Sequence, residues 1–158
     1  MIINKIFLCL ALSSLSNTDF QMNKNSIKTA CAMSEQIILK SNEKELSAFL
    51  LTSMIWAESR WQKAAVSNKG ACGLTQVLPK YSEYTCKELQ NPKTSINEGS
   101  RALSFWVAKK QNVEKALECY NSGYRCRSPY YAKQIIEKTK ILKARYLKIS
   151  KKYKGTTK

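Results

Sequence analysis

The sequence predicts a mainly α-helical protein built as one domain. Its 158 residues suffice for one compact domain, and its 44% hydrophobic content can fill one core. Only 5 glycines and 3 prolines are present, too few for a turn-rich all-β chain or a disordered one. Apolar residues also recur at helical spacing in several segments. These three observations together favour an all-helical core with few irregular connections.

The apolar pattern predicts five helices after the first twenty residues. They are expected over residues 27–40, 46–61, 96–110, 113–120 and 130–146. Ser41 or Asn42 is expected to cap the second helix, Asn91-Pro92 to start the third, and Pro129 to open the last. Residues 63–80 hold two glycines and a proline, so we expect an irregular segment there with at most a small β element.

The two ends of the chain differ from the middle. Residues 1–18 combine a positive Lys5, a short apolar run and small residues, as in a signal peptide or a short membrane-targeting segment. The apolar run is too short for a typical spanning helix. Two alternatives remain, a buried first helix of the mature domain and a weak anchor that is later released. Residues 27–147 form the expected folded domain, and residues 148–158 a basic, flexible tail.

The formal net charge of +16 indicates a polyanionic partner. Nucleic acid, anionic lipid and the anionic bacterial wall all satisfy this requirement. The lysines are spread along the whole chain, so the charge can equally be a composition that keeps the protein soluble. Charge alone therefore does not select the partner.

The cysteines favour disulfides over a metal site. If Cys9 is lost with a leader, four of the remaining five fall into two local pairs, Cys72 with Cys86 and Cys119 with Cys126. Cys31 is then the odd one out. The spacings match no zinc finger or ribbon, and the chain has no histidine. We therefore expect no metal, no cofactor and an oxidising compartment.

Glu58 is the strongest candidate for catalysis. It lies near the end of the most apolar helix, between Trp56 and Trp61. A carboxyl group held against aromatic side chains is desolvated, which favours its protonated form at neutral pH. This is the property that a general acid for glycosidic cleavage needs. The alternatives are an exposed helix residue or an ion-pair partner of Arg60 or Lys63.

Four short motifs follow one another in a fixed order. They are Glu58-Ser59, Gly73-Leu74-Thr75-Gln76 with Pro79, Asn91-Pro92 with Ser95-Ile96-Asn97-Glu98-Gly99, and Tyr120-Asn121-Ser122-Gly123. The series resembles the soluble lytic transglycosylase domain, a relative of the goose-type lysozymes, and the match runs from about Leu46 to about Ile136. The resemblance implies a lysozyme-like fold and makes residues 27–147 the catalytic domain.

The resemblance also implies a role for each matching residue. Glu58 corresponds to the catalytic acid and base, and Ser67 and Gln76 to polar residues that line the substrate groove. Tyr120 and Asn121 correspond to the pair that approaches the reacting sugar from the opposite wall. Gln76 alternatively only ties down its loop, and Tyr120 alternatively belongs to the core.

Two positions depart from the family pattern. Thr75 stands where a methionine is usual, and Ser95 where the family has the second asparagine of its Asn-x-x-x-Asn-Ile stretch. Such changes can alter local packing or a substrate contact without touching the acid.

The acidic residues favour a mechanism with a single carboxyl group. A hydrolase with two carboxylates needs a second acid across the sugar. The candidates in the right region are Glu83, Glu88 and Glu98, and none lies in a convincing motif. The resemblance then implies cleavage between N-acetylmuramic acid and N-acetylglucosamine in peptidoglycan, with formation of 1,6-anhydromuramic acid. Hydrolysis, as in goose-type lysozymes, and a non-catalytic wall-binding module are the alternatives.

The expected partners follow from this substrate. They are the glycan strands of peptidoglycan, with no nucleic acid and no stable membrane span after processing. We expect a monomer, unless the chain is part of a virion or a secretion assembly. Its place would be the periplasm or the extracellular space, or the virion if a phage encodes it.

Overall fold

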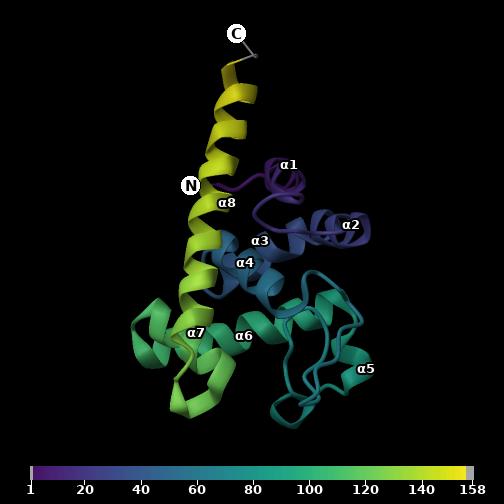
Figure 1. Ribbon diagram of the computed structural model, residues 1–158, viewed down its shortest axis with the longest axis vertical. Helices are drawn as coiled ribbons and strands as arrows, with labels where there is room; N and C mark the ends of the chain where they lie inside the picture. The colour runs from purple at the N-terminus through teal and green to yellow at the C-terminus, as the bar shows by residue number, and fades with distance from the viewer. Residues whose placement is uncertain (1, 156–158) are drawn as a thin grey trace.

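The computed structural model describes residues 2–155, which are mainly helical (Figure 1). Two isolated β-bridges, Val66 with Cys72 and Cys72 with Val77, are the strand-like features of these residues. The predicted mainly α fold class is confirmed. The helices are α1 (Lys5–Leu15), α2 (Lys24–Ala32), α3 (Ser34–Glu43), α4 (Ala48–Ser59), α5 (Cys86–Leu89), α6 (Pro92–Lys110), α7 (Val113–Ser122) and α8 (Pro129–Gly155), with short 3-10 turns η1 (Pro79–Tyr81) and η2 (Gly123–Arg125).

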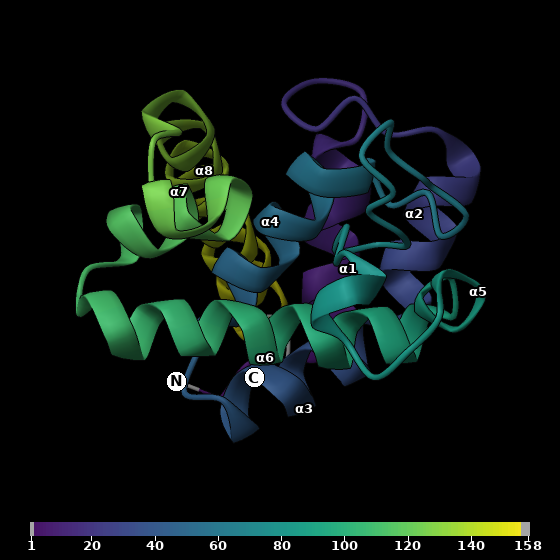
Figure 2. The same cartoon turned by 90° about the horizontal axis from the view of Figure 1, so that it is seen from below.

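Helix α4 lies at the centre of the view in Figure 2, with α7 to one side, α2 to the other and α6 below, and α8 packs against both α4 and α1. Nearly every residue of α4 is buried, because apolar side chains are present on all faces of this helix. Its N-cap is Ser47, whose hydroxyl accepts a hydrogen bond from the Leu50 N–H. Residues 48–56 of α4 are all buried, and Ala57 and Glu58 near its end are partly buried.

The expected cap at Ser41 or Asn42 is wrong. Both residues lie inside α3, and the Ser41 side chain is buried. Helix α3 ends at Glu43, Glu45 then has a left-handed φ of 54°, and helix α4 begins only after Ser47. A left-handed residue that is not glycine is uncommon, so no residue type in this stretch indicates the break.

The predicted helix over residues 27–40 is two helices, α2 and α3, separated at Met33. Asn23 caps α2 by accepting a hydrogen bond from the Ser26 N–H at 2.8 Å. The Met33 N–H still bonds to the Thr29 carbonyl, so the chain turns here and keeps its helical hydrogen bond.

Helix α1 packs into the core rather than standing apart from it. Leu8, Leu12 and Leu15 are at most 1% exposed, and Cys9 forms a disulfide with Cys31 of α2. Cys31 therefore has the partner that the loss of Cys9 would remove. That residues 1–18 act as a cleaved leader stays a prediction.

Helix α6 starts, and helix α7 ends, at the residues that the sequence indicated. Asn91 caps α6 by accepting hydrogen bonds from the N–H groups of Lys93 and Thr94, and Gly123 ends α7. Helix α8 continues to Gly155, so residues 148–155 are helical, whereas the last helix was expected to end at residue 146; the flexibility of the tail stays a prediction. Residues 156–158 of the predicted tail lie outside the described part. Among the described residues, no helix has both the length and the apolar character to span a membrane.

Candidate active site

Helix α4 ends abruptly just after Glu58. Arg60 and Trp61 both adopt left-handed conformations, with φ of 51° and 64°. Two such residues in succession are costly for side chains that have a Cβ, so packing must hold them in place. The guanidinium of Arg60 stacks 3.7 Å from the centroid of the Trp56 ring, and Trp61 is only 1% exposed. The tight turn holds Glu58 at the end of a rigid, buried helix.

The Glu58 carboxyl is half-buried and accepts a hydrogen bond from the Tyr131 hydroxyl on α8. Burial raises the pKa of Glu58 from 4.5 to about 7, although the hydrogen bond from Tyr131 opposes this rise. A substantial fraction of the group is therefore protonated at neutral pH. A carboxyl group of this kind can both give and take a proton near pH 7.

Tyr120 of α7 lies in the same neighbourhood. Its hydroxyl donates to the Thr75 carbonyl at 2.7 Å. Burial and, next, the negative charge of Glu58 raise the pKa of Tyr120 well above its ordinary value. The same two causes, with Tyr120 as a further one, raise the pKa of Tyr131. Glu58 thus has two tyrosines near it that stay protonated at physiological pH.

Tyr131 is a site residue that none of the sequence motifs contains. It comes after the last motif and is 73 positions from Glu58. Its neighbour Tyr130 is 80% exposed, whereas Tyr131 is partly buried. A pair of tyrosines in the first turn of a helix was the available signal, but only the rotation of α8 decides which of them faces Glu58.

Ser67 and Gln76 lie in the irregular segment that follows α4. The Ser67 hydroxyl accepts from the Ala71 N–H at 3.0 Å. The Gln76 amide donates to the carbonyls of Ala65 and Gly73, at 3.1 and 2.9 Å. Both side chains therefore brace the segment from within. Their predicted contacts with substrate stay predictions.

Asn121 is exposed at the end of α7, and its amide donates to the Ser128 hydroxyl at 2.8 Å. It follows Tyr120 in the chain, but no hydrogen bond among the described residues joins it to Glu58. The structure brings Glu58, Tyr120 and Tyr131 together and leaves Asn121 at the rim.

The two departures from the family pattern bond to each other. The Thr75 N–H donates to the Ser95 hydroxyl at 3.1 Å, and the Thr75 hydroxyl donates to the Ser95 carbonyl at 2.7 Å. Gly99, one turn further along α6, faces the same threonine, and a Cβ there would lie 2.4 Å from the Thr75 Cβ. Because Tyr120 bonds to Thr75, these contacts tie the tyrosine beside Glu58 to helix α6.

The other candidate carboxylates are engaged or exposed. Glu88 closes a capping box with Thr85, and Glu83 is exposed. Glu98 is buried, and it pairs with Arg101 at 2.9 Å and accepts from Ser82 at 2.8 Å. Burial favours its neutral form, but these hydrogen bonds and the charge of Arg101 outweigh burial and lower the pKa of Glu98. Glu98 is therefore held as a structural anion.

Two disulfides brace the segments around the site. The pair Cys72–Cys86 joins the irregular segment to α5, and the pair Cys119–Cys126 joins α7 to the end of η2. Both are the pairs that the sequence suggested. No cysteine of the described residues is free.

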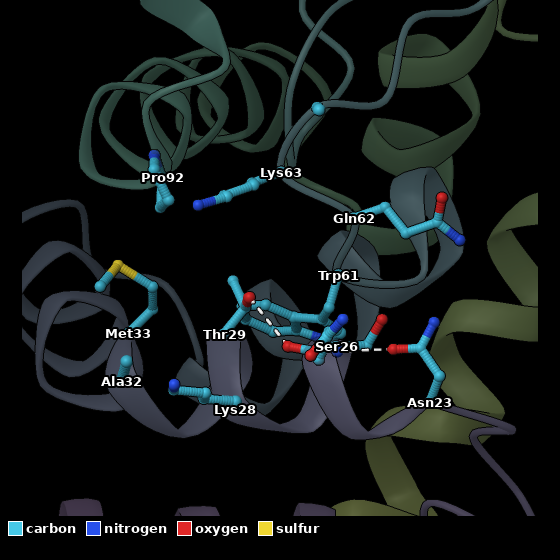
Figure 3. Close-up of a pocket in the computed structure, with 12 residues that line it drawn as sticks. Asn23, Ser26, Lys28, Thr29, Ala32, Met33, Trp61, Gln62, Lys63 and Pro92 are labelled. Atoms are coloured by element: carbon cyan, nitrogen blue, oxygen red, sulfur yellow. Dashed lines mark hydrogen bonds between the residues drawn. The ribbon is translucent and has the colours of Figure 1, made fainter.

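A concavity of about 690 Å³ lies away from the tyrosines, between α2, the turn after α4 and the start of α6 (Figure 3). In that view Lys63 points into the opening, with Met33 and Pro92 at its side. Glu58 does not line this space, so cavity size alone does not locate the chemistry. Within residues 2–155, no group of three or more Cys, Asp or Glu side chains could hold a metal ion.

Comparison with known proteins supports the assignment of fold and family. One solved structure with a similar fold is that of an inactive Glu-to-Gln mutant of the lytic transglycosylase Slt from Pseudomonas aeruginosa. The TM-score is 0.55 and the identity 18%; the match covers 77% of this chain and 22% of that enzyme. The likeness confirms the predicted lysozyme-like fold. A comparison with curated proteins gives no match.

The family itself is shown by sequence. The family model described as "Transglycosylase SLT domain" matches residues 35–142, most of the chain, and this range contains Glu58, both tyrosines and all four motifs. Helices α1 and α2 precede the matched range. The chain belongs to the transglycosylase SLT domain family, as its motifs indicated.

Proposed function

We propose that this protein cleaves the β-1,4 bond between N-acetylmuramic acid and N-acetylglucosamine in peptidoglycan, with Glu58 as the acid and then the base. The observation that carries this proposal is the half-buried Glu58 carboxyl, whose pKa burial raises to about 7. The Slt mutant of the same fold, inactive after one Glu-to-Gln substitution, agrees with a single essential glutamate.

In the first step, protonated Glu58 donates to the bridging oxygen as the bond from that oxygen to C1 breaks. The acetamido group of the muramyl sugar would stabilise C1. Glu58 is then ionised, and the hydroxyl of Tyr131 stabilises the carboxylate by its hydrogen bond. In the second step, the C6 hydroxyl attacks C1 and gives its proton to Glu58. The ring closes as 1,6-anhydromuramic acid, Glu58 is protonated again, and no water is consumed.

The other carboxylates support this route over hydrolysis. An inverting hydrolase needs a carboxylate that activates water, and a retaining one needs a carboxylate nucleophile. Glu83 and Glu88 are exposed, and Glu98 is already paired with Arg101. A site with a single carboxyl group and two tyrosines fits attack on C1 by the C6 hydroxyl of the same sugar better than attack by an activated water.

Tyr120 and the polar residues have positioning roles in this proposal. The hydroxyl of Tyr120 is bonded to the Thr75 carbonyl, so the tyrosine forms a fixed wall beside Glu58. Ser67 and Gln76 hold the irregular segment after α4 in shape and would contact sugar through the acceptor sites that their hydrogen bonds leave free. Asn121 would contact substrate at the rim. The three disulfides favour action in an oxidising compartment outside the cytoplasm.

The test is digestion of purified peptidoglycan by the oxidised full-length protein beside Glu58→Gln, with sugar ends identified by mass spectrometry. We expect 1,6-anhydromuramic ends from the wild type and none from the variant. Reducing ends would replace the proposed mechanism with hydrolysis. Binding without cleavage by the wild type would leave a wall-binding module in place of an enzyme.

A further inference from the structure

Helix α8 carries half of the formal net charge of the protein. Its 27 residues contain nine Lys or Arg and one acid, Glu137, whereas the whole chain has a net charge of +16. After Glu137 the sequence has no further acidic residue. Figure 1 shows the C-terminal half of α8 extending beyond the other helices. The positive charge is therefore concentrated on one projecting element, although the lysines as such are spread along the chain.

Five exposed lysines of α8 lie on one side of this helix. Their spacings of seven, three, five and three residues keep them within a sector of about 140°, over a length of about 27 Å. No ion pair within residues 2–155 involves any of the five. We call this set the cationic face of α8: Lys133, Lys140, Lys143, Lys148 and Lys151.

The opposite side of α8 packs into the fold up to Tyr146. Ala132, Ile135, Leu142 and Tyr146 are at most 3% exposed, and Tyr131 reaches Glu58 from this side. The cationic face thus points away from the candidate active site. A ligand bound there does not enter the site, and substitutions there leave the Glu58 surroundings unchanged.

We propose that the cationic face of α8 binds the anionic polymers of the bacterial cell wall and holds the enzyme on its substrate. A row of unpaired lysines on a rigid helix suits a flexible chain of carboxylates or phosphates, because each ammonium is a point charge that demands no fixed geometry. The choice of the wall as the source of the polyanion rests on the proposed function.

Two other polyanions fit less well. Helices that lie on membranes insert an apolar face into the lipid, but the apolar residues of α8 from Ala132 to Tyr146 are buried in the core. Nucleic acid is abundant in the cytosol, where three disulfides would not persist. The wall combines a high density of negative charge with an oxidising surrounding.

The test uses full-length protein carrying Glu58→Gln, so that binding is measured without cleavage. One variant adds Lys140→Glu, Lys143→Glu and Lys151→Glu. A matched variant instead reverses three exposed lysines elsewhere, at positions 24, 87 and 93, and so has the same net charge. Pull-down on insoluble walls is measured over a range of salt concentrations, with walls that retain their phosphate polymers and walls treated with hydrofluoric acid to remove them.

We expect the α8 variant to bind walls at least fivefold more weakly, with a salt slope smaller by about one for each anionic group that is no longer neutralised. The matched variant should bind as the parent does. Weaker binding only on phosphate-bearing walls would assign the ligand to phosphates, and weaker binding on both preparations to the carboxylates of the peptides. Equal weakening in the two variants would overturn the proposal, as would tighter binding to anionic vesicles or duplex DNA than to walls.

Wall binding by α8 and cleavage by Glu58 can be tested separately. With Glu58 intact, the α8 variant should cleave short soluble glycan fragments at the parental rate and intact walls more slowly at low salt. A parent that binds walls but cleaves neither substrate would reject the enzymatic proposal and leave the wall-binding surface standing.

Discussion

Replacing Glu58 by glutamine should abolish cleavage and yet make the folded protein more stable at alkaline pH. Burial raises the pKa of Glu58 from 4.5 to about 7. A tenfold change in proton affinity corresponds to about 1.4 kcal/mol, so the carboxylate lowers the stability of the fold by about 3 kcal/mol once it is fully ionised. Glutamine is neutral at every pH and retains an acceptor oxygen for Tyr131, so this cost disappears.

The direction in which stability changes with pH follows from the raised pKa of Glu58. Below pH 4.5 the group is protonated in both the folded and the unfolded protein, and its stabilising contribution is fully present. As the pH rises through about 7, the folded protein must ionise a desolvated group, and that contribution is lost. The advantage of Glu58→Gln over the wild type should therefore be small at pH 4.5 and reach its full size at pH 8.

The assay is thermal unfolding of both proteins at pH 4.5, 6 and 8. For a chain of this length, about 3 kcal/mol corresponds to a Tm higher by about 6 to 12 °C for the variant at pH 8. Glu114→Gln, at an exposed carboxyl on α7, is the control and should show no such dependence. A Tm difference between wild type and Glu58→Gln that is the same at every pH would contradict a destabilising ionisation of Glu58. A variant less stable than the wild type at pH 8 would contradict it as well.

Three further outcomes are expected. Tyr131→Phe should lower cleavage by at least about tenfold and move the pH–rate profile to higher pH, because the hydrogen bond that it removes lowers the pKa of Glu58; an unchanged profile would contradict this. Gly99→Ala should destabilise the fold by about 1 to 3 kcal/mol in denaturant titration, because its Cβ would clash with Thr75, and a neutral effect would refute that contact. Deletion of residues 2–18 should lower the Tm of the oxidised protein, since it removes buried leucines and one disulfide; an unchanged Tm would favour a dispensable leader.

The sequence was informative where local chemistry decides the structure. Asn91 and Pro92 start α6, and Gly123 ends α7, because caps and breakers act through their own backbone and side chain. Glu58 was identifiable because an isolated carboxyl within a strongly apolar helix is costly unless it has a function. The two local cysteine pairs were identifiable because each closes a short loop, with separations of 14 and 7 residues.

Other features depend on contacts between distant segments. The helix break at Met33 and the left-handed Glu45 carry no glycine or proline, so no local pattern reveals them. Tyr131 contacts Glu58 only because α8 packs against α4 in one rotation. The internal bonds of Gln76 belong to the folded segment, and a motif match cannot distinguish them from contacts with substrate.

The bonded pair of Thr75 and Ser95 makes the two positions interdependent. The usual residues at these positions are a methionine and an asparagine. Replacing Thr75 by methionine alone would remove the donor to the Ser95 carbonyl and press a longer side chain against Gly99. Replacing Ser95 alone would place a larger amide where both residues are fully buried. Neither single exchange is neutral, and because the two residues are bonded to each other, their effects on stability should not be additive in a double-mutant cycle.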